Sequence, residues 1–521
     1  MTESRVKKSL LNAKVNLVFY VLTLVLTFFS RKIFFNCLGT EFVGFTTTLQ
    51  NLLGFLNLAE LGIGAAIAFI LYKPLYDVDQ NKICEIISIL GYLYRRIGIF
   101  ICIVGFVLSF FLPLIFPKTE FSFWFIYCAY YSYLASSLIG YLINYRQNLL
   151  AADQRNYIIS SCFQGCCILK ILVQMSLAFY FGNYYAWIGV ELLFGIIYSV
   201  ILNRKINQIY PWLNSNLRQG RNLLKKYPEV TFFVKQVFFH KLGSVALQQI
   251  TPFLTYAFTS LSVVALYSNY SIITGKLGSL YCAFMDGTNA GVGNLVAEGN
   301  ICKIKKIFWE LTSIRYFIGS ICSFCIYMLT DSFISLWLGK SYILDNSILG
   351  LVCIGTYIGY TRGAIDQFIH GYGLFWDVWA PVAELVINIA VACFFGYCWG
   401  LQGVLLGGIV SQIIIAKIWK PWFLYHYGFR LCVWDYVIRL IAIYLCVAFP
   451  LLTEYYFIKN LVPIDFYASY LNWIIYAFIV FSSCFLLTFT CMICFLPSFR
   501  SIFMRLYNSW FLRNKSKPGL N

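Results

Sequence analysis

Ionisable side chains recur inside the long apolar stretches of this chain, and they are the residues whose chemistry demands an explanation. They are Arg31, Glu60, Lys170, Glu191, Lys276, Asp286, Arg362, Asp366 and Glu384. An ionisable group in the middle of a bilayer costs about 2.5–3.5 kcal/mol, so each one needs a partner or a function. Such residues predict either ion pairs that hold helices together or the lining of a path for a polar substrate.

One stretch carries several of these groups on a single face. Arg362, Asp366 and His370 are spaced i, i+4, i+8, which places them on the same side of a helix. One interpretation is a structural ion pair that allows Arg362 to enter the membrane. The other is a polar stripe that faces a central cavity, where Arg362 reaches a phosphate of the substrate. The spacing alone leaves both open.

Two further cations are candidates for binding an anionic substrate. Lys276 lies near the middle of its apolar stretch between Gly275 and Gly278, so a ligand or another helix could approach it closely. It either faces a cavity or pairs with an acidic residue. Arg31 lies near the outer end of the first stretch, where it either binds substrate or extends to the membrane surface.

A polar face also marks the stretch at 240–260. Gln248, Thr251, Thr255 and Thr259 share one side of a helix, and Pro252 interrupts its hydrogen-bond ladder. We expect Gln248, Thr251 and Thr255 to line a cavity wall that bends. The alternative is that these hydroxyls bond to their own backbone.

Two carboxyl groups are candidates for coupling to an ion gradient. Glu60 and Asp366 lie in apolar surroundings, where a carboxyl group can load and release a proton. Asp366 can also be neutralised by Arg362, so Glu60 is the better single candidate. We expect Lys170, Glu191 and Glu384 to be structural.

The elements that position these residues are predicted to be transmembrane helices. The chain has 521 residues, of which 60% are hydrophobic and only 12% are charged, unlike a soluble protein. Apolar runs long enough to cross a bilayer recur along it and lack the alternation of a barrel. The sequence therefore predicts an all-α integral membrane protein with about 14 spans. They are 15–35, 42–71, 97–116, 121–143, 158–181, 184–202, 240–260, 262–284, 314–337, 345–369, 379–398, 401–424, 436–458 and 466–495.

The basic residues predict the orientation of the chain. Most of its 39 Lys and Arg residues fall in the connections on the side of the N-terminus, which indicates that both termini are cytoplasmic. The outer connections hold only Arg31, Lys32, Lys118, Lys340 and Lys459. The net charge of +18 thus reflects topology and attraction to anionic membrane lipids, and we expect no nucleic-acid partner.

The connections also predict the domain organisation. We expect an N-terminal six-helix lobe at 1–203, a basic cytoplasmic connection at 204–239 and a C-terminal six-helix lobe at 240–430. An extra helix pair and a basic tail follow at 431–521. No connection is large enough for a catalytic or nucleotide-binding domain, and Gly339-Lys340-Ser341 lacks the preceding glycine of a phosphate-binding loop. We therefore expect a transporter without cofactor or metal rather than an enzyme.

Several stretches then resemble a known family. The chain resembles the polysaccharide repeat-unit flippases (Wzx-type) of the multidrug/oligosaccharidyl-lipid/polysaccharide exporter superfamily. The resemblance covers about residues 10–430, and its first two stretches are the most specific. The stretches are SRKIFFNCLGTEFVGF at 30–45, AELGIGAAIAFILYKPLYDVDQNKIC at 59–84, LLAADQRNY at 149–157, GLFWDVWAPVAELVIN at 373–388, GLQGVLLGGIVSQ at 400–412 and KPWFLY at 420–425.

The resemblance implies a fold and a substrate. It implies two six-helix lobes that form a V around a central cavity. It implies alternating access that carries a lipid (undecaprenyl-type) diphosphate-linked oligosaccharide to the outer leaflet of the bacterial cytoplasmic membrane, for lipopolysaccharide O-antigen, capsule or another surface polysaccharide. Arg31, Lys276 and Arg362 would meet the diphosphate. H+ or Na+ would drive the antiporter, and other polysaccharide-assembly proteins are expected partners. Relatives often carry an Asp near the position of Gln248, so its role does not transfer to this chain.

Other functions remain open at this point. An ion-coupled multidrug exporter of the same superfamily would bind cationic drugs in an acidic cavity, which the basic candidates oppose. A membrane polymerase or ligase of the same pathway would need a large outer loop, which the sequence lacks. A scaffold would gain nothing from costly charges inside the membrane.

Overall fold

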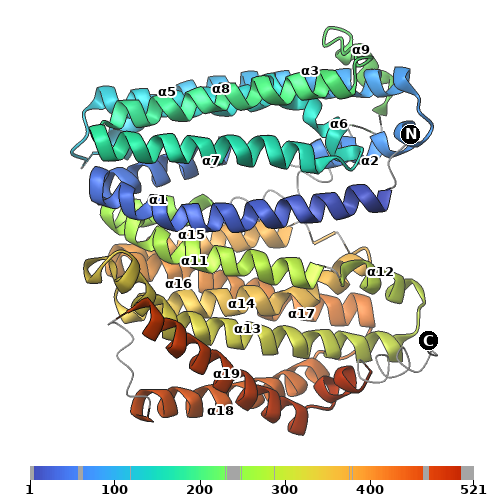
Figure 1. Ribbon diagram of the computed structural model, residues 1–521. Coiled ribbons are helices and arrows are strands. Elements are labelled where there is room, and N and C mark those ends of the chain that lie inside the picture. Colours follow the sequence, from blue (N-terminus) through green and yellow to red (C-terminus); the bar gives the residue numbers. More distant parts are fainter. Residues whose placement is uncertain are drawn as a thin grey trace, which may run out of the picture. The chain divides into compact units, whose positions relative to one another are not determined.

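The structure is a computed structural model of the whole chain, and every regular element of the part it describes is a helix (Figure 1). That part comprises residues 5–56, 63–117, 119–228, 230, 247, 249–286, 288–374, 376–377, 379–461 and 469–505. The chain divides into two compact units, Met1–Ala265 and Leu266–Asn521. The lobe bounds predicted from the sequence remain a prediction.

The first unit is a bundle of long helices with short connecting ones. In this unit α1 and α8 both pack against α7, α5 lies against α3 and α8, and α9 covers α3 (Figure 1). Its core is rich in large apolar side chains such as Phe42, Phe45 and Tyr130. The helices are α1 (Arg5–Leu56), α2 (Ile63–Tyr76), α3 (Gln80–Ser109), α4 (Leu112–Ile115), α5 (Phe123–Leu142), α6 (Gln147–Ala152), α7 (Asn156–Phe181), α8 (Tyr184–Ile209) and α9 (Gly220–Lys226).

A kink at Gly39 bends α1, which begins in the first predicted span and continues into the second. Gly39 has φ +84° and ψ 166°, a backbone conformation that is essentially confined to glycine. The predicted break between 35 and 42 therefore coincides with Gly39, a non-helical residue at which two helical segments of α1 meet. The predicted second span corresponds to the end of α1 together with α2.

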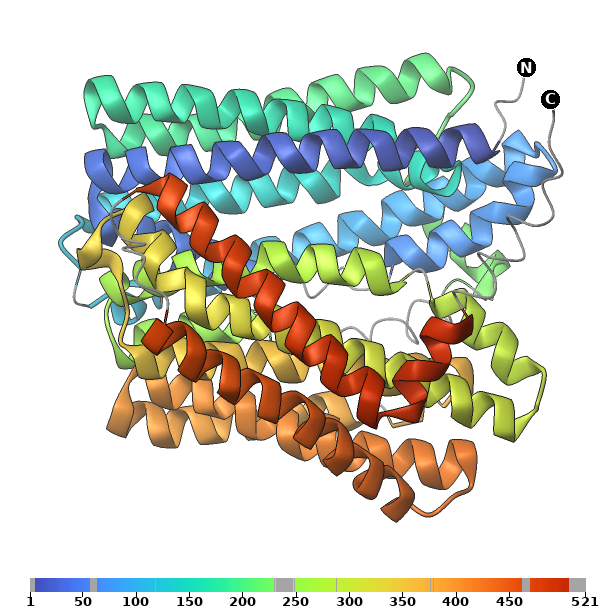
Figure 2. The ribbon, with the colours of Figure 1, turned by 60° about the horizontal axis from the view of Figure 1, so that its bottom comes forward.

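The second unit contains a packed pair of helices joined tightly through small residues. Helices α15 and α16 make the most extensive contact, because Gly407 lies against Asn388 and Ala392. Helix α13 packs against α14 and α19, and α19 runs obliquely across this unit (Figure 2). The helices are α11 (Leu261–Asp286), which starts just before the unit boundary, α12 (Asn289–Ala297), α13 (Ile301–Trp337), α14 (Asn346–Gly371), α15 (Trp379–Trp399), α16 (Leu401–Gln412), α17 (Lys420–Phe423), α18 (Trp434–Leu461) and α19 (Tyr470–Phe495).

Ten helices of the described chain are long and apolar enough to cross a membrane, or up to 11 if a bent pair at Phe123–Ala152 forms one span. This confirms an all-helical, multi-pass membrane protein but does not confirm the predicted count of 14. The count is lower than 14 partly because α1 is counted as one span, although it extends across the kink into the second predicted span. In addition, α11 is long enough but not apolar enough, and the first part of the predicted span at 240–260 lies outside the described residues.

Candidate functional site

The second unit holds a cluster of charged side chains centred on Arg362 of α14. Its Nε donates to Asp366 Oδ2 at 3.2 Å, one turn along the same helix. Its Nη1 donates to Glu384 Oε1 of α15 at 3.0 Å. Glu384 is 2% exposed, so it fits the structural role expected of it. The side chains of Arg362 and Asp366 are each about a quarter exposed, so they also remain accessible from outside the bundle.

Two lysines complete this cluster. Lys420 at the start of α17 donates through Nζ to Asp366 Oδ1. Lys417 donates to the hydroxyl groups of Thr361 at 2.6 Å and of Tyr316 at 2.9 Å. Neither lysine is within ion-pair distance of any other carboxylate in the described chain. Three cations thus meet two carboxylates, and the cluster carries an excess of positive charge. We call these five charged residues the Arg362 cluster.

Local backbone geometry positions the two lysines. The segments Ile413–Trp419 and Leu424–Phe429, on either side of α17, are π-helical. The wider turns of a π-helix are rare and are frequently associated with functional sites. Lys417 and Lys420 were not among the residues predicted from the sequence. Their i, i+3 spacing, in the stretch that ends with KPWFLY, was the signal that could have identified them.

A fourth cation, Arg315 of α13, is buried beside this part of α14. It is 5% exposed, and its Nη1 donates to the Tyr281 hydroxyl at 3.3 Å. Its guanidinium lies against Gly363, where a Cβ would come within 2.3 Å of Nη1. In the described chain no carboxylate pairs with Arg315. Arg315 was not predicted as a site residue, because it falls at the edge of an apolar run.

The other predicted cations have different surroundings. In the first unit, Arg31 donates through Nη2 to the Ala265 carbonyl at 3.3 Å and lies over the Phe35 ring at 5.1 Å. In the second unit, Lys276 is partly buried on α11, and a Cβ at its neighbour Gly275 would meet open space. That Arg31, Lys276 and Arg362 line one cavity stays a prediction.

The threonines of the predicted polar face bond to their own helix. The hydroxyl of Thr255, which is fully buried, donates to the Thr251 carbonyl at 2.8 Å, and that of Thr259 donates to the Thr255 carbonyl. The hydroxyls of Thr255 and Thr259 therefore follow the alternative interpretation, in which they bond to the backbone of their own helix. Gln248 and Glu60 lie outside the described residues, so their predicted roles stay predictions.

A second ion pair lies inside the first unit. Lys170 of α7 donates to Glu191 of α8 at 2.6 Å, and Gln174 donates to the other carboxylate oxygen at 3.1 Å. The contact joins two adjacent helices and satisfies both charges. This geometry fits the structural role expected of Lys170 and Glu191.

Comparison with known proteins identifies solved structures that share this fold. No family model and no curated protein matches the chain. Solved structures do match. The lipid II flippase MurJ in an inward closed conformation aligns with TM-score 0.65 and 14% identity, over 91% of this chain and 98% of that one. The chain shares the fold of this structure.

Multidrug transporters share this fold. An inward-facing multidrug resistance MATE family transporter of the MOP superfamily aligns with TM-score 0.54 and 15% identity, over 79% of this chain and 97% of that one. A MATE transporter in complex with MaL6 aligns with TM-score 0.50 and 15% identity, over 81% and 96%. At these identities the likeness establishes the fold and not the roles of individual residues.

Proposed function

We propose that this protein flips a lipid diphosphate-linked oligosaccharide repeat unit from the inner to the outer leaflet of the cytoplasmic membrane. The observation that carries the proposal is the excess of positive charge in the Arg362 cluster. Cations inside an apolar helical unit favour a bulky anionic head group. A diphosphate offers several oxygens to the planar donors of Arg362 and to the two lysines.

The fold comparison supports a lipid-linked substrate. The flippase aligns with a higher TM-score than the two multidrug transporters, 0.65 against 0.54 and 0.50. It also covers 91% of this chain, against 79% and 81%. The additional part of this chain that aligns with the flippase is comparable in length to the helix pair α18 and α19.

The geometry supports a specific mode of substrate binding. Glu384 holds Arg362 from the buried side, which fixes the guanidinium while its side chain stays partly exposed. Asp366 bonds both Arg362 and Lys420 from the other side. A diphosphate would compete with Asp366 for these two cations, and Lys417 would add a third positive charge. Substrate binding would thereby change the bonding of the carboxyl group proposed for ion coupling.

The second candidate is an ion-coupled multidrug exporter. The fold shared with MATE transporters favours it. The Arg362 cluster disfavours it, because excess positive charge repels cationic drugs.

The test is a vesicle assay with the full chain and a fluorescent lipid diphosphate-linked oligosaccharide. Arg362→Gln should slow flipping about tenfold or more, because a hydrogen bond to a charged group contributes about 1.5–3 kcal/mol. The matched control is Arg439→Gln, which also removes an arginine paired with a carboxylate at i,i+4 and should flip within about twofold of wild type. Normal flipping by Arg362→Gln at equal protein content would overturn the proposed substrate site. Flipping of a cationic drug instead would favour the exporter.

A further inference from the structure

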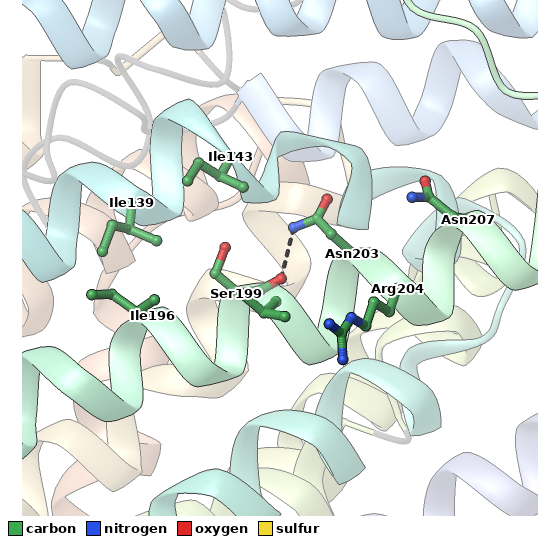
Figure 3. Close-up of a pocket in the computed structure, with 8 residues that line it drawn as sticks. Ile139, Ile143, Ile196, Ser199, Asn203, Arg204 and Asn207 are labelled. Atoms are coloured by element: carbon green, nitrogen blue, oxygen red, sulfur yellow. Dashed lines mark hydrogen bonds between the residues drawn. The ribbon is translucent and has the colours of Figure 1, made fainter.

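A pocket of about 300 Å³ lies in the first unit, between α5 and α8. Its lining combines an apolar part with a polar end (Figure 3). The lining residues are Ile139, Ile143, Ile196, Ser199, Val200, Asn203, Arg204 and Asn207. The Arg362 cluster belongs to the other unit, so this pocket is a separate site.

The apolar part is a slot between two helices that opens outward. Ile139 and Ile143 come from α5 and its C-terminal end, and Ile196 comes from α8 (Figure 3). Val200, one turn further along α8, also lines the slot. The side chains of Ile143, Ile196 and Val200 are between 44% and 47% exposed. Large apolar side chains at this exposure suit contact with hydrocarbon rather than with water.

The polar end presents hydrogen-bond donors. Arg146 donates through Nη1 to Asn207 Oδ1 and through Nη2 to Asn203 Oδ1, both at 2.9 Å. These bonds occupy the amide oxygens of the two asparagines. Asn203 Nδ2 in turn donates to Asn144 Oδ1 at 2.9 Å. The Asn207 amide nitrogen donates to no residue of the described chain, so it is available to a ligand.

Arg204 supplies the charge at this end. It is exposed, and within the described chain it forms neither a hydrogen bond nor an ion pair. None of the eight lining residues is acidic. The donors and the positive charge together complement a phosphate group.

The position of the pocket along α8 suits a ligand that has both an apolar chain and a charged head group. Helix α8 begins at Tyr184, and at 1.5 Å per residue Arg204 lies about 30 Å further along, roughly the thickness of the bilayer core. The isoleucine slot therefore falls within the hydrocarbon and Arg204 at its boundary with the headgroups. The predicted orientation places this end at the inner leaflet, where anionic lipids concentrate.

We propose that this pocket binds an anionic phospholipid, with one acyl chain in the isoleucine slot and the phosphate at Arg204 and Asn207. Its volume is at the lower end for ligand pockets, which suits one acyl segment and a phosphate but excludes an oligosaccharide. The bound lipid bridges α5 and α8 at their inner ends. It is a resident lipid and not the transported substrate.

The test is native mass spectrometry of the full chain in detergent, titrated with dioleoyl phosphatidylglycerol or dioleoyl phosphatidylcholine. Arg204→Gln should weaken phosphatidylglycerol binding about fivefold, the effect of one basic residue near a membrane surface. It should leave phosphatidylcholine binding unchanged. Lys205→Gln is the matched control, because it removes the same charge one residue along, on another face of the helix. Val200→Trp fills the slot and should weaken binding of both lipids.

Three outcomes overturn the proposal. The first is an equal loss of phosphatidylglycerol binding in the Arg204→Gln and Lys205→Gln proteins, which indicates attraction to charge anywhere on this surface. The second is unchanged binding in Val200→Trp. The third is displacement of phosphatidylglycerol by glycerol 3-phosphate, which indicates an anion site that does not use the slot. If each variant melts at the same temperature as the wild type, misfolding is excluded as the cause of a loss of lipid binding.

Discussion

Arg362 and Glu384 form a two-point ion pair between α14 and α15, with Nη1 3.0 Å from Oε1 and Nη2 3.5 Å from Oε2. Glu384 is almost fully buried and pairs with no other cation in the described chain, whereas Arg362 also bonds Asp366. Removal of Arg362 therefore leaves the buried charge of Glu384 uncompensated, which typically costs about 3–5 kcal/mol. Any functional test of Arg362 must therefore separate loss of the pair from loss of the cation.

The first prediction uses this dependence. Arg362→Gln should lower the melting temperature of the purified protein strongly, because Glu384 is left buried without a cation. The double variant with Glu384→Gln should melt closer to wild type, since no uncompensated buried charge then remains. If the double variant is stable and still flips substrate normally, Arg362 is structural and the proposed substrate site is wrong.

The second prediction concerns Lys417, which bonds hydroxyl groups and no carboxylate in the described chain. Lys417→Gln should raise the substrate concentration for half-maximal flipping about tenfold, because it removes a charge-assisted contact to phosphate. Tyr316→Phe is the control, since it removes a hydrogen-bond partner of Lys417 but keeps the charge. Equal effects of the two substitutions would indicate a packing role for Lys417.

The third prediction concerns the kink of α1. Gly39→Ala should destabilise the protein by about 1–3 kcal/mol, because φ +84° with ψ 166° is strained for any residue with a Cβ. Gly189→Ala, where a Cβ meets open space within α8, should be neutral or slightly stabilising. Thermal melting in detergent measures both. Equal melting temperatures would mean that Gly39 does not hold this conformation.

The helices could be predicted from the sequence where lipid sets both of their ends. The apolar run at 379–398 predicts α15 (Trp379–Trp399) within one residue, and that at 121–143 predicts α5 closely. In contrast, α3 begins at Gln80 rather than 97, and α13 begins at Ile301 rather than 314. Hydropathy marks the part of a helix that lies in lipid, and these two helices continue beyond it through polar residues.

The site could be predicted only where its contacts are local. The i, i+4 spacing of Arg362 and Asp366 predicts their contact, and the structure contains it. The bond from Arg362 to Glu384 depends on how α14 packs beside α15, which no spacing within one helix reveals. Lys417 lies in a π-helical segment, whose changed periodicity is not visible in the pattern of apolar residues. Membrane spans were therefore easier to predict than the partners of their charges.

The fourth prediction concerns the basic connection after α8. Lys226 at the end of α9 donates to both carboxylate oxygens of Glu85 on α3, at 2.9 and 2.8 Å, and the Tyr227 hydroxyl donates to the same carboxylate. Glu85→Gln should release α9 and speed tryptic cleavage at Lys225 and Lys226. Glu298→Gln, which breaks an exposed ion pair with Lys303, should leave this cleavage unchanged. Unchanged cleavage in Glu85→Gln would show that other contacts hold α9.

The same contact has a defined pH dependence. The hydrogen bond to Glu85 raises the pKa of Lys226 above its ordinary value of 10.5. A group whose pKa is raised by folding stabilises the folded state fully below its unfolded pKa and loses that contribution as the pH rises through the folded one. Cleavage at this site should therefore stay slow at neutral pH and accelerate in the alkaline range above 10.5, as measured with a protease active there.

The last prediction is that flipping is coupled to an H+ or Na+ gradient through Asp366. Asp366 bonds Arg362 and Lys420, so an ion that neutralises it changes the two cations proposed to hold the diphosphate. Moving one charge through 100 mV supplies about 2.3 kcal/mol, enough to drive net transport. Asp366→Asn should therefore flip at a rate that no longer responds to an imposed gradient. Asp435→Asn is the matched control, because Asp435 also bonds two cations, Lys305 and Arg439, and its variant should keep the response. Flipping by the wild type that is unchanged when both gradients are collapsed would exclude coupling and leave a passive flippase driven by consumption of the product outside.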